Sequence, residues 1–236
     1  MVKNKKILGI LIIIGLLLTL ILTRDGLLIG QLSYNDDQDL IPLKELNKDS
    51  EIIELIYNRS SIREYNSTQL SRDVISKVIW STVGINADGM SGPTRATPSA
   101  GATNPLVIYV SVSNVDELDK GLYRYLPKQN ALKYEVKENI SNEISEAAIN
   151  QTAVKEAPVS LIITANYNNT TNKYGERGIK YVHIESGAAA QNALLTAQNY
   201  GLGGVIIGAF EAEKLKKIMG DISEEPLLIL PFGNYN

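Results

Sequence analysis

The sequence predicts an α+β fold, in which a sheet of about five strands packs against helices and an N-terminal transmembrane helix precedes the domain. Three observations support this prediction. Short apolar runs bounded by turn residues are typical of strands, and they lie among segments whose apolar residues recur at helical spacing. The two kinds of segment mix without a strict strand–helix repeat, which favours α+β over α/β. A separate uncharged run near the N-terminus has no polar face, unlike a helix of a soluble domain.

The composition narrows the function classes. The chain has 236 residues, of which 44% are hydrophobic and 21% charged, as in a globular domain with one appendage. It has no cysteine, which excludes disulfides, thiolate zinc sites and cysteine nucleophiles. His183 is its one histidine, so a multi-histidine metal site is excluded, and we expect no metal. A net charge of −3 argues against broad nucleic-acid binding, so we expect no nucleic-acid partner.

The uncharged run at residues 7–22 is predicted to anchor the chain in a membrane. A cleaved signal peptide, the alternative, shares its basic start and apolar centre, but no small-x-small cleavage site follows Leu22. Three lysines precede the run and one arginine follows it, which favours a single-pass protein with an extracytoplasmic domain. The predicted organisation is therefore an anchor at residues 1–25, a polar linker at 26–49 and a soluble domain at 50–236.

The first half of the domain is predicted to begin with two helices. One covers residues 51–59, with Asp49 and Ser50 as cap candidates, and the other begins at Ser71. Residues 84–104 are rich in small residues and proline, and an ordered loop of that length is usually functional. Strand-like runs follow at residues 106–113, 122–125 and 132–136.

The second half alternates between helices and strands. A helix is predicted near residues 140–150, a buried strand at 159–165, a long helix at 181–200, a short strand at 205–207, a helix at 211–219 and a last strand at 227–231. The long helix has a small-residue centre, Gly187–Ala190, which lets another backbone approach closely.

Three segments are candidates for ligand binding, since phosphate-loop, Rossmann and G-x-S-x-G motifs do not occur. Arg59-Ser60-Ser61-Ile62-Arg63 combines two guanidinium groups with hydroxyls, which suits a phosphate, although a solvated helix end is the alternative. In residues 98–105 two prolines fix the backbone, while small residues let main-chain N–H groups meet a planar or anionic ligand. Gly208 follows an apolar strand and permits a similar approach. For these two segments, an ordinary loop and a helix-breaking corner are the alternatives.

Taken in order, these segments resemble the FMN-dependent nitroreductase family, and in particular its SagB-type dehydrogenase branch, which includes oxidases of peptide azolines. The resemblance runs from Arg59 to Gly233. It is carried by Arg59-Ser60-Ser61-Ile62-Arg63, Pro98-Ser99-Ala100-Gly101, Gly121-Leu122-Tyr123-Arg124-Tyr125, Lys173-Tyr174-Gly175-Glu176-Arg177-Gly178, Glu185-Ser186-Gly187-Ala188-Ala189-Ala190-Gln191-Asn192, Gly201-Leu202-Gly203, Gly208-Ala209-Phe210 and Leu230-Pro231-Phe232-Gly233.

The resemblance implies a nitroreductase-like sheet and a homodimer that holds FMN at the subunit interface, with NAD(P)H as a candidate electron donor. The long helix is similar to the family's dimer helix. The implied activity is a two-electron, hydride-transferring oxidoreductase, and a flavin-binding or ligand-binding module without turnover is the alternative. The implied FMN contacts are Arg59, Ser60, Ser61 and Arg63 at the phosphate and pyrimidine edge, Pro98, Ser99, Ala100 and Gly101 over the ring from the partner subunit, and the backbone of Ile207, Gly208 and Ala209 near the reactive nitrogen.

Two departures from the family pattern stand out. No basic residue follows the last strand, so either phosphate binding is weaker or another residue, such as Lys180, completes the phosphate site. Ala102 stands where many members of the family carry an asparagine. Members of the SagB-type branch often lack this asparagine, so the departure supports the assignment to that branch.

Lys173 and Tyr174 resemble the Lys-Tyr pair of the azoline oxidases and are the predicted catalytic residues. A lysine can act as a base and a tyrosine as its partner. A solvated loop is the alternative, because residues 166–172 are strongly polar. We expect packed or hydrogen-bonded roles for His183 and Glu185.

Overall fold

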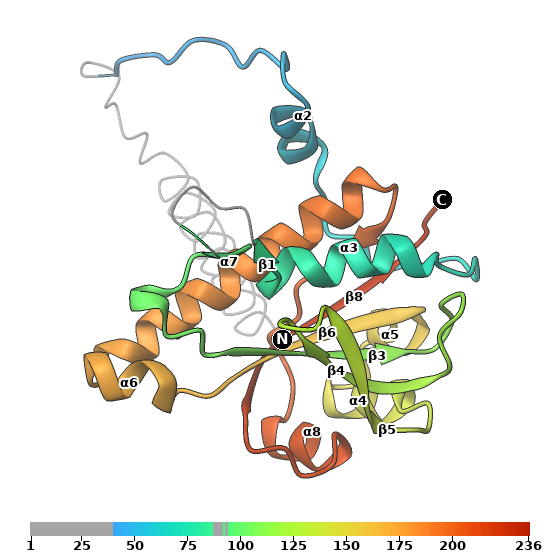
Figure 1. The fold of residues 1–236 in the computed structure, drawn as a ribbon. Helices are drawn as coiled ribbons and strands as arrows, with labels where there is room; N and C mark the ends of the chain where they lie inside the picture. Colours follow the sequence, from blue (N-terminus) through green and yellow to red (C-terminus); the bar gives the residue numbers. More distant parts are fainter. Residues whose placement is uncertain (1–39, 87–91, 93) are drawn as a thin grey trace, which may run out of the picture. The chain divides into compact units, whose positions relative to one another are not determined.

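A computed structural model describes residues 40–86, 92 and 94–236 (Figure 1). The predicted anchor at residues 7–22 and most of the predicted linker lie outside these residues. Within the described ranges, no helix combines the length and the apolar character that crossing a membrane requires. Residues 40–47 are exposed coil, and the contacts gather Lys48–Asn236 into a separate unit. The proposed division into anchor, linker and domain stays a prediction.

The domain is built on an antiparallel sheet of six strands, one more than the predicted number. The order across the sheet is β5-β4-β3-β6-β8-β7. The central strands β3 (Leu106–Val112) and β6 (Val159–Ala165) pair along their whole length. They are almost entirely buried, which explains their continuous apolar sequence. The flanking strands are β4 (Gly121–Leu126), β5 (Ala131–Val136), β7 (Gly203–Gly204) and β8 (Glu225–Gly233).

Helices cover both faces of the sheet and form two cores. On one face, α3 (Arg72–Val83) packs against the long α7 (Arg177–Asn199), as Figure 1 shows. On the other face lie α4 (Ser141–Ala147), α5 (Thr152–Glu156) and α8 (Ala212–Ile218). The predicted α+β class, with a central sheet flanked by helices, is confirmed.

Several elements differ locally from the prediction. The helix expected near residues 140–150 is two short helices, α4 and α5, because Ile149 and Asn150 have positive φ angles. The strand expected at residues 205–207 is β7, two residues earlier, while Ile207 makes an isolated bridge to Ile229. The long loop contains the hairpin of β1 (Ile85–Asn86) and β2 (Thr94–Arg95) and the 3₁₀ turn η1 (Ala100–Ala102).

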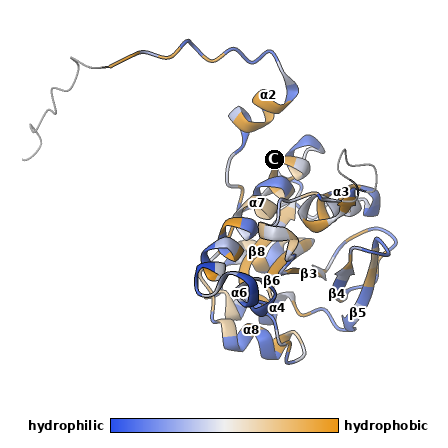
Figure 2. Ribbon diagram, turned by 60° about the vertical axis from the view of Figure 1, so that its left-hand side comes forward, coloured by the Kyte–Doolittle hydropathy of each residue, from blue (hydrophilic) through white to orange (hydrophobic). Residues whose placement is uncertain are grey.

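The polar segment before Lys173 is a helix. It forms α6 (Asn168–Tyr174), which Figure 2 shows as strongly hydrophilic. The solvated-loop alternative is therefore wrong for the backbone. Burial of Thr170 and close packing of Thr171 on Gly178 attach α6 to α7, so tertiary contacts override a weak intrinsic helix propensity.

The small-residue centre of α7 serves the subunit's own core. Ala189 and Ala190 are completely buried among the residues of the α3–α7 face. The exposed side of the helix carries Gly187 and Ile184 instead, and Ile184 is 59% exposed. If a second backbone approaches α7, it meets this side and not the alanines.

Candidate functional site

The Arg59–Arg63 segment follows α2 (Glu51–Asn58) and is attached to the edge of the sheet. The backbone N–H of Ile62 donates to the carbonyl of Gly204 at 3.0 Å. A Cβ atom added to Gly203 would lie 2.7 Å from the Cβ of Ile62, closer than real side chains approach. Only glycine therefore lets the segment lie this close to β7.

Both arginines in this segment have charges that no described acid neutralises. Neither guanidinium forms a salt bridge within the described part of the chain. Arg59 and Ser60 line a shallow pocket with Gln198 of α7, whereas Ser61 and Arg63 line a neighbouring hollow of about 500 Å³. The two sides of the segment thus present two positive groups and two hydroxyls, a set of donors that suits an anion.

The C-terminus closes against the same region without adding a positive charge. The Tyr65 hydroxyl donates to the carbonyls of Ile62, at 2.8 Å, and Pro231, at 3.1 Å, and burial raises the pKa of this tyrosine. Tyr235 lines both hollows. Lys180, the predicted substitute for a basic residue here, lies 18 positions before Gln198 on α7, about 27 Å away at 1.5 Å per residue. It does not join the arginines within one chain.

The predicted ring-covering loop, Pro98 to Gly101, lies elsewhere. The Ser99 Oγ atom accepts a hydrogen bond from the N–H of Asn104 at 2.9 Å, which closes the loop on itself. Pro98, Ser99 and Ala102 line a hollow of about 380 Å³ together with Arg95. The loop therefore offers small side chains and a nearby guanidinium to a ligand.

Lys173 and Tyr174 meet this loop. The Lys173 ammonium donates to the carbonyl of Gly101 at 3.1 Å. A Cβ atom on Gly101 would clash with the Tyr174 hydroxyl and with that ammonium, and its φ of 57° also favours glycine. The Tyr174 ring packs edge-on against Tyr181 at 5.2 Å. Two motifs about 70 residues apart in sequence thus form one cluster.

Glu185, which the sequence placed among packed residues, lies directly behind the loop. Its carboxyl group lies beside the Ser99 side chain and the Ala100 backbone, and both favour the ionised form. Burial raises the pKa of this carboxyl group to about 7, and these two groups and the charge of Arg95 oppose that rise. His183 also has a polar neighbour, since its Nε2 lies 3.0 Å from the Tyr167 hydroxyl. The contact of Glu185 with the Pro98–Gly101 loop was not predicted, because the two segments are far apart in the sequence and meet only in the folded chain.

The third predicted contact segment, Ile207 to Ala209, runs beside β8. Ile207 is buried and exchanges backbone hydrogen bonds of 2.8 and 2.9 Å with Ile229. Gly208 and Ala209 are exposed, and Gln151 donates to the Ala209 carbonyl at 3.1 Å. A Cβ atom on Gly208 would meet nothing within 4 Å, so packing inside the subunit does not require a glycine there.

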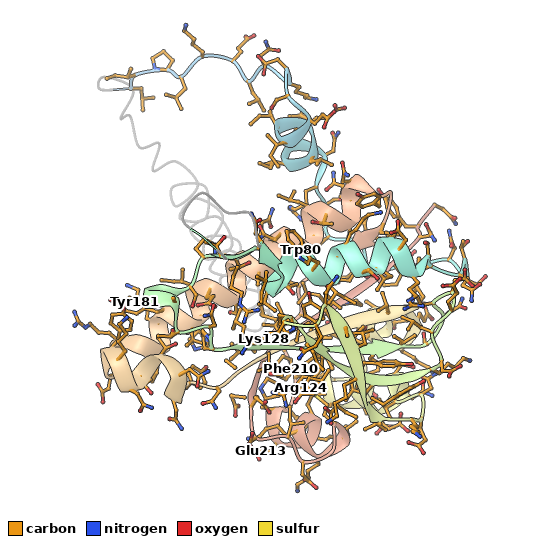
Figure 3. All side chains as sticks on the ribbon, viewed as in Figure 1. Trp80, Arg124, Lys128, Tyr181, Phe210 and Glu213 are labelled. Carbon is orange, nitrogen blue, oxygen red and sulfur yellow. The ribbon has the colours of Figure 1, made fainter. Side chains whose placement is uncertain are left out.

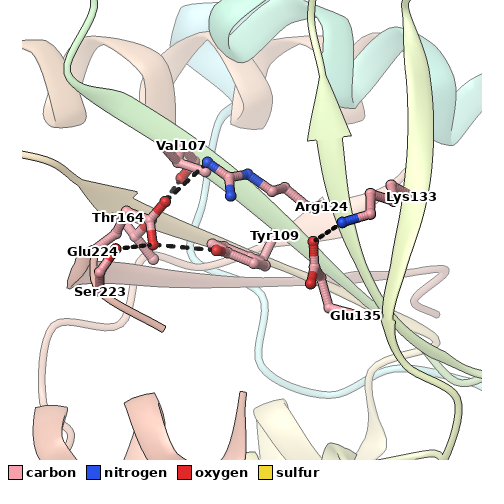
Figure 4. A network of polar contacts seen from close by, with 8 residues as sticks. All are labelled: Val107, Tyr109, Arg124, Lys133, Glu135, Thr164, Ser223 and Glu224. Atoms are coloured by element: carbon pink, nitrogen blue, oxygen red, sulfur yellow. Dashed lines mark hydrogen bonds and ion pairs between the residues drawn. The ribbon is translucent and has the colours of Figure 1, made fainter. Parts of the chain in front are cut away.

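Arg124, from the Gly121–Tyr125 motif, has a structural role (Figure 4). Its guanidinium forms a 2.9 Å ion pair with Glu224, and the Tyr109 hydroxyl reaches the same carboxylate at 3.4 Å. This network ties β4 and β3 to the turn that precedes β8. A motif that carried the resemblance therefore stabilises the sheet.

The two candidate groups stand apart along α7. The Arg59–Arg63 segment packs near Gln198, whereas the loop docks at Glu185 and α6 packs at Gly178. These positions are 13 to 20 residues apart on the helix, or about 20 to 30 Å. Figures 1 and 3 show α2 near one end of α7 and α6, with Tyr181, at the other.

Comparison with known sequences gives one family. The model of the Nitroreductase family matches residues 56–234. A Methanocaldococcus jannaschii protein named "Putative nitroreductase MJ1384" is 39% identical over 180 residues, which cover 76% of this chain and 89% of the relative.

Solved structures share the fold. A crystal structure of a "putative nitroreductase" from Anabaena variabilis gives a TM-score of 0.69 at 22% identity, over 78% of this chain and 38% of that one. This chain thus spans less than half of that protein. The E. coli microcin synthetase McbBCD with truncated pro-MccB17 gives 0.64 at 20% identity, over 84% and 76%. The NADPH:FMN oxidoreductase from Vibrio harveyi complexed with NAD⁺ gives 0.56 at 20% identity, over 78% and 69%.

Proposed function

Because this chain belongs to the nitroreductase family of flavin oxidoreductases, we propose that it holds FMN between two copies of itself and transfers electron pairs through the flavin. The observation that carries the proposal is the separation of the two candidate groups along α7. At one end of α7, one chain offers the candidate anion site, formed by Arg59–Arg63. At the other end it offers the small residues of the Pro98–Gly101 loop, which we call the cradle loop. Two chains with antiparallel α7 helices bring one group of each kind together, twice.

The residues present fit FMN. Arg59, Ser60, Ser61 and Arg63 supply unpaired positive charge and hydroxyls for the phosphate and the pyrimidine edge. Pro98, Ser99, Ala100 and Gly101 of the second copy cover the ring. Open space above Gly208 leaves the backbone of Gly208 accessible to the flavin, whereas the N–H and the carbonyl of the predicted contact Ile207 are both bonded to Ile229. Bound flavin supplies two-electron chemistry, and a guanidinium near its pyrimidine edge favours the anionic reduced form.

A second copy also explains the exposed apolar side chains on the α3–α7 face. Ile184 is 59% exposed, Ile179 is 45% exposed, and Trp80 on α3 is 38% exposed. Large apolar side chains exposed in this way are candidates for an interaction surface. The proposed homodimer buries them against each other.

Lys173 and Tyr174 are proposed to move a proton for a substrate bound over the flavin. In support, both reach the cradle loop at Gly101. The proposed branch is the SagB-type dehydrogenases, with NAD(P)H as the electron donor. In the full proposal, residues 7–22 anchor the protein as a single-pass membrane protein with an extracytoplasmic domain.

The proposal is tested on the full chain, purified in detergent. We expect a yellow protein that binds FMN and is bleached by NADPH, with bound flavin reoxidised by an added acceptor. A protein that binds FMN but is not reduced favours the alternative, a binding module without turnover. A protein that does not bind FMN contradicts both.

The role of Lys173 and Tyr174 is tested separately. Tyr174→Phe keeps the ring and its packing on Tyr181, so we expect normal flavin content but slower turnover. An unchanged rate would show that the hydroxyl has no part in proton transfer. Tyr134→Phe, at an exposed tyrosine on β5, is the matched control.

A further inference from the structure

The cradle loop has a backbone conformation that requires support. Gly101, Ala102 and Asn104 have positive φ angles of 57°, 57° and 46°. An alanine in this left-handed region is strained, and such strain persists only where the surroundings fix the backbone. Within the loop, the N–H of Ala102 donates to the Ser99 carbonyl at 3.1 Å, and Ser99 Oγ accepts from Asn104. Ser99 therefore accepts two of the hydrogen bonds that fix the loop in this conformation.

Glu185 holds Ser99 from the buried side. Its side chain on α7 is only 5% exposed, and its carboxyl group lies beside the Ser99 side chain and the Ala100 backbone, both of which favour its ionised form. Burying a carboxyl group is costly unless hydrogen bonds compensate for the lost water. The Ser99 oxygen accepts from the N–H of Asn104, and its hydroxyl lies beside the buried Glu185 carboxyl group, so the residue links loop and helix.

The remaining contacts hold the other half of the loop. Lys173 donates to the Gly101 carbonyl from an exposed position, and Thr103 Oγ1 lies 2.8 Å from Thr170 Oγ1 of α6. Both partners belong to α6, and they contact the loop at Gly101 and Thr103. For the first half, the described contact from another element is Glu185.

We propose that Glu185 is a positioning residue, which fixes residues 98–101 against α7 so that the loop meets the flavin already in its binding conformation. The inference rests on the proposed FMN site. A loop that is ordered in advance loses little conformational entropy when a ligand binds, and this raises affinity. Glu185 itself acts through Ser99 and Ala100.

The test measures FMN dissociation constants by flavin fluorescence quenching on the full chain. We expect Glu185→Ala to weaken FMN binding about tenfold or more, the loss of at least one charge-assisted hydrogen bond. Glu185→Gln keeps an acceptor for Ser99, so we expect it to restore most of the affinity, within about threefold of the parent. Glu185→Met fills nearly the same volume without an oxygen acceptor, so we expect it to bind FMN as weakly as Glu185→Ala, whereas a purely space-filling role would leave its affinity close to that of the parent. Glu143→Gln, at an exposed carboxylate on α4, is the matched control.

A double-mutant cycle tests whether Glu185 affects FMN binding through Ser99. Ser99→Ala should weaken FMN binding, and adding Glu185→Ala should cost little more, because the two side chains act on one another. Fully additive losses, or a Glu185→Ala variant with the parent's affinity, would overturn the inference while leaving the FMN site intact. If Glu185→Ala does not fold, unchanged affinity in both Glu185→Gln and Ser99→Ala overturns it. A parent chain that binds no FMN refutes the proposed function instead.

Discussion

Glu185 is a buried carboxyl residue whose ionisation differs between the folded and the unfolded chain in the acid-to-neutral pH range. Burial raises the pKa of its carboxyl group from an ordinary value of 4.5 to about 7. The native state therefore keeps this proton at pH values where the unfolded chain has released it. The stabilising contribution of this proton is fully present below pH 4.5 and is lost as the pH rises toward 7. The reason is that the slope of the free energy of unfolding against pH follows the difference in the number of protons bound by the two states.

This linkage gives a prediction for stability. Relative to Glu185→Gln, the free energy of unfolding of the flavin-free parent should fall by up to about 3 kcal/mol between pH 4.5 and pH 8. Urea unfolding at several pH values, with both variants in the same buffers, measures it. Parallel pH profiles for the two proteins would contradict the assigned ionisation.

Arg59 and Arg63 are the residues from which we expect the largest effect on the cofactor. A charge-assisted hydrogen bond contributes about 1.5–3 kcal/mol, so either alanine substitution should weaken FMN binding by one to two orders of magnitude, roughly. Lysine should restore only part of the loss, because it cannot bind phosphate with a planar fork. Isothermal titration with FMN measures the effect, and Arg72→Ala, at an exposed arginine beside Glu117, is the control. A fully yellow double-alanine variant with an unchanged dissociation constant would refute the assignment.

At the scale of elements, β7 is a two-residue strand whose glycines bring the arginine segment to the sheet. Gly203 faces Ile62, and Gly204 faces Phe232 at a separation that leaves no room for a side chain. The geometry of the anion site therefore depends on β7 as much as on the arginines themselves.

Gly203→Ala should consequently reduce both stability and FMN affinity. The added methyl group overlaps Ile62, and overpacking of this kind typically costs about 1–3 kcal/mol. Thermal unfolding and FMN titration are the measurements. Ile62→Ala in the same chain should recover part of the loss, and a Gly203→Ala variant that matches the parent in both would show that the segment is not held by this contact.

Elements with a strong local signal were predictable from the sequence. The helix at Arg72–Val83 and the buried strands at Leu106–Val112 and Val159–Ala165 follow from periodicity and continuous apolar runs. The helix Asn168–Tyr174 was not predictable, because its residues favour turns and its stability comes from contact with α7. The short strand at Gly203–Gly204 has no strand composition either, and its pairing with β8 decides its state.

The same distinction applies to the candidate site. The sequence indicates which residue types suit a phosphate or a flat ring, and so identifies Arg59, Arg63 and the Pro98–Gly101 loop. It gives no sign that Lys173 contacts Gly101 or that Glu185 lies behind Ser99, because these contacts link segments about 70 to 86 residues apart. Periodicity places Ala189 on α7 but does not tell which chain covers it.

The exposed side of α7 gives a prediction for assembly. Ile184→Glu should shift the protein toward monomers, because it places a charge in the proposed apolar interface. Ile149→Glu, at an isoleucine that is 64% exposed after α4, is the matched control. Sedimentation velocity in detergent over a range of concentrations distinguishes the species. An Ile184→Glu protein that stays dimeric would move the interface to another face.

At the scale of the whole molecule, the antiparallel sheet and α7 hold the two candidate groups at a fixed distance that no side-chain movement can close. Each chain contains one candidate anion site and one cradle loop, but the two lie too far apart to bind the same flavin. In the proposed dimer, every flavin is bound by residues from both chains.

Shared sites predict complementation. A chain with Arg59→Ala and Arg63→Ala should bind little FMN, and so should a chain with Gly101→Leu, whose side chain collides with Lys173 and Tyr174. Mixed dimers of the two chains contain one site with both lesions and one with none. Differently tagged chains, co-purified as mixed dimers, should therefore carry about one FMN per dimer. Mixed dimers that are as colourless as their parents would place each site within a single chain.

The 23-residue length of α7 therefore has a consequence for when the protein is active. If the proposed dimer holds the flavin, a chain that meets no second copy cannot bind FMN, and the yellow colour of the protein would report how often copies encounter one another. Tethering to a membrane would confine these encounters to two dimensions and raise the effective concentration of the chains. The expression level in the bilayer would then set the fraction of chains that carry flavin. Dilution of the purified protein below the concentration at which the proposed dimer dissociates would release the cofactor before the fold is lost.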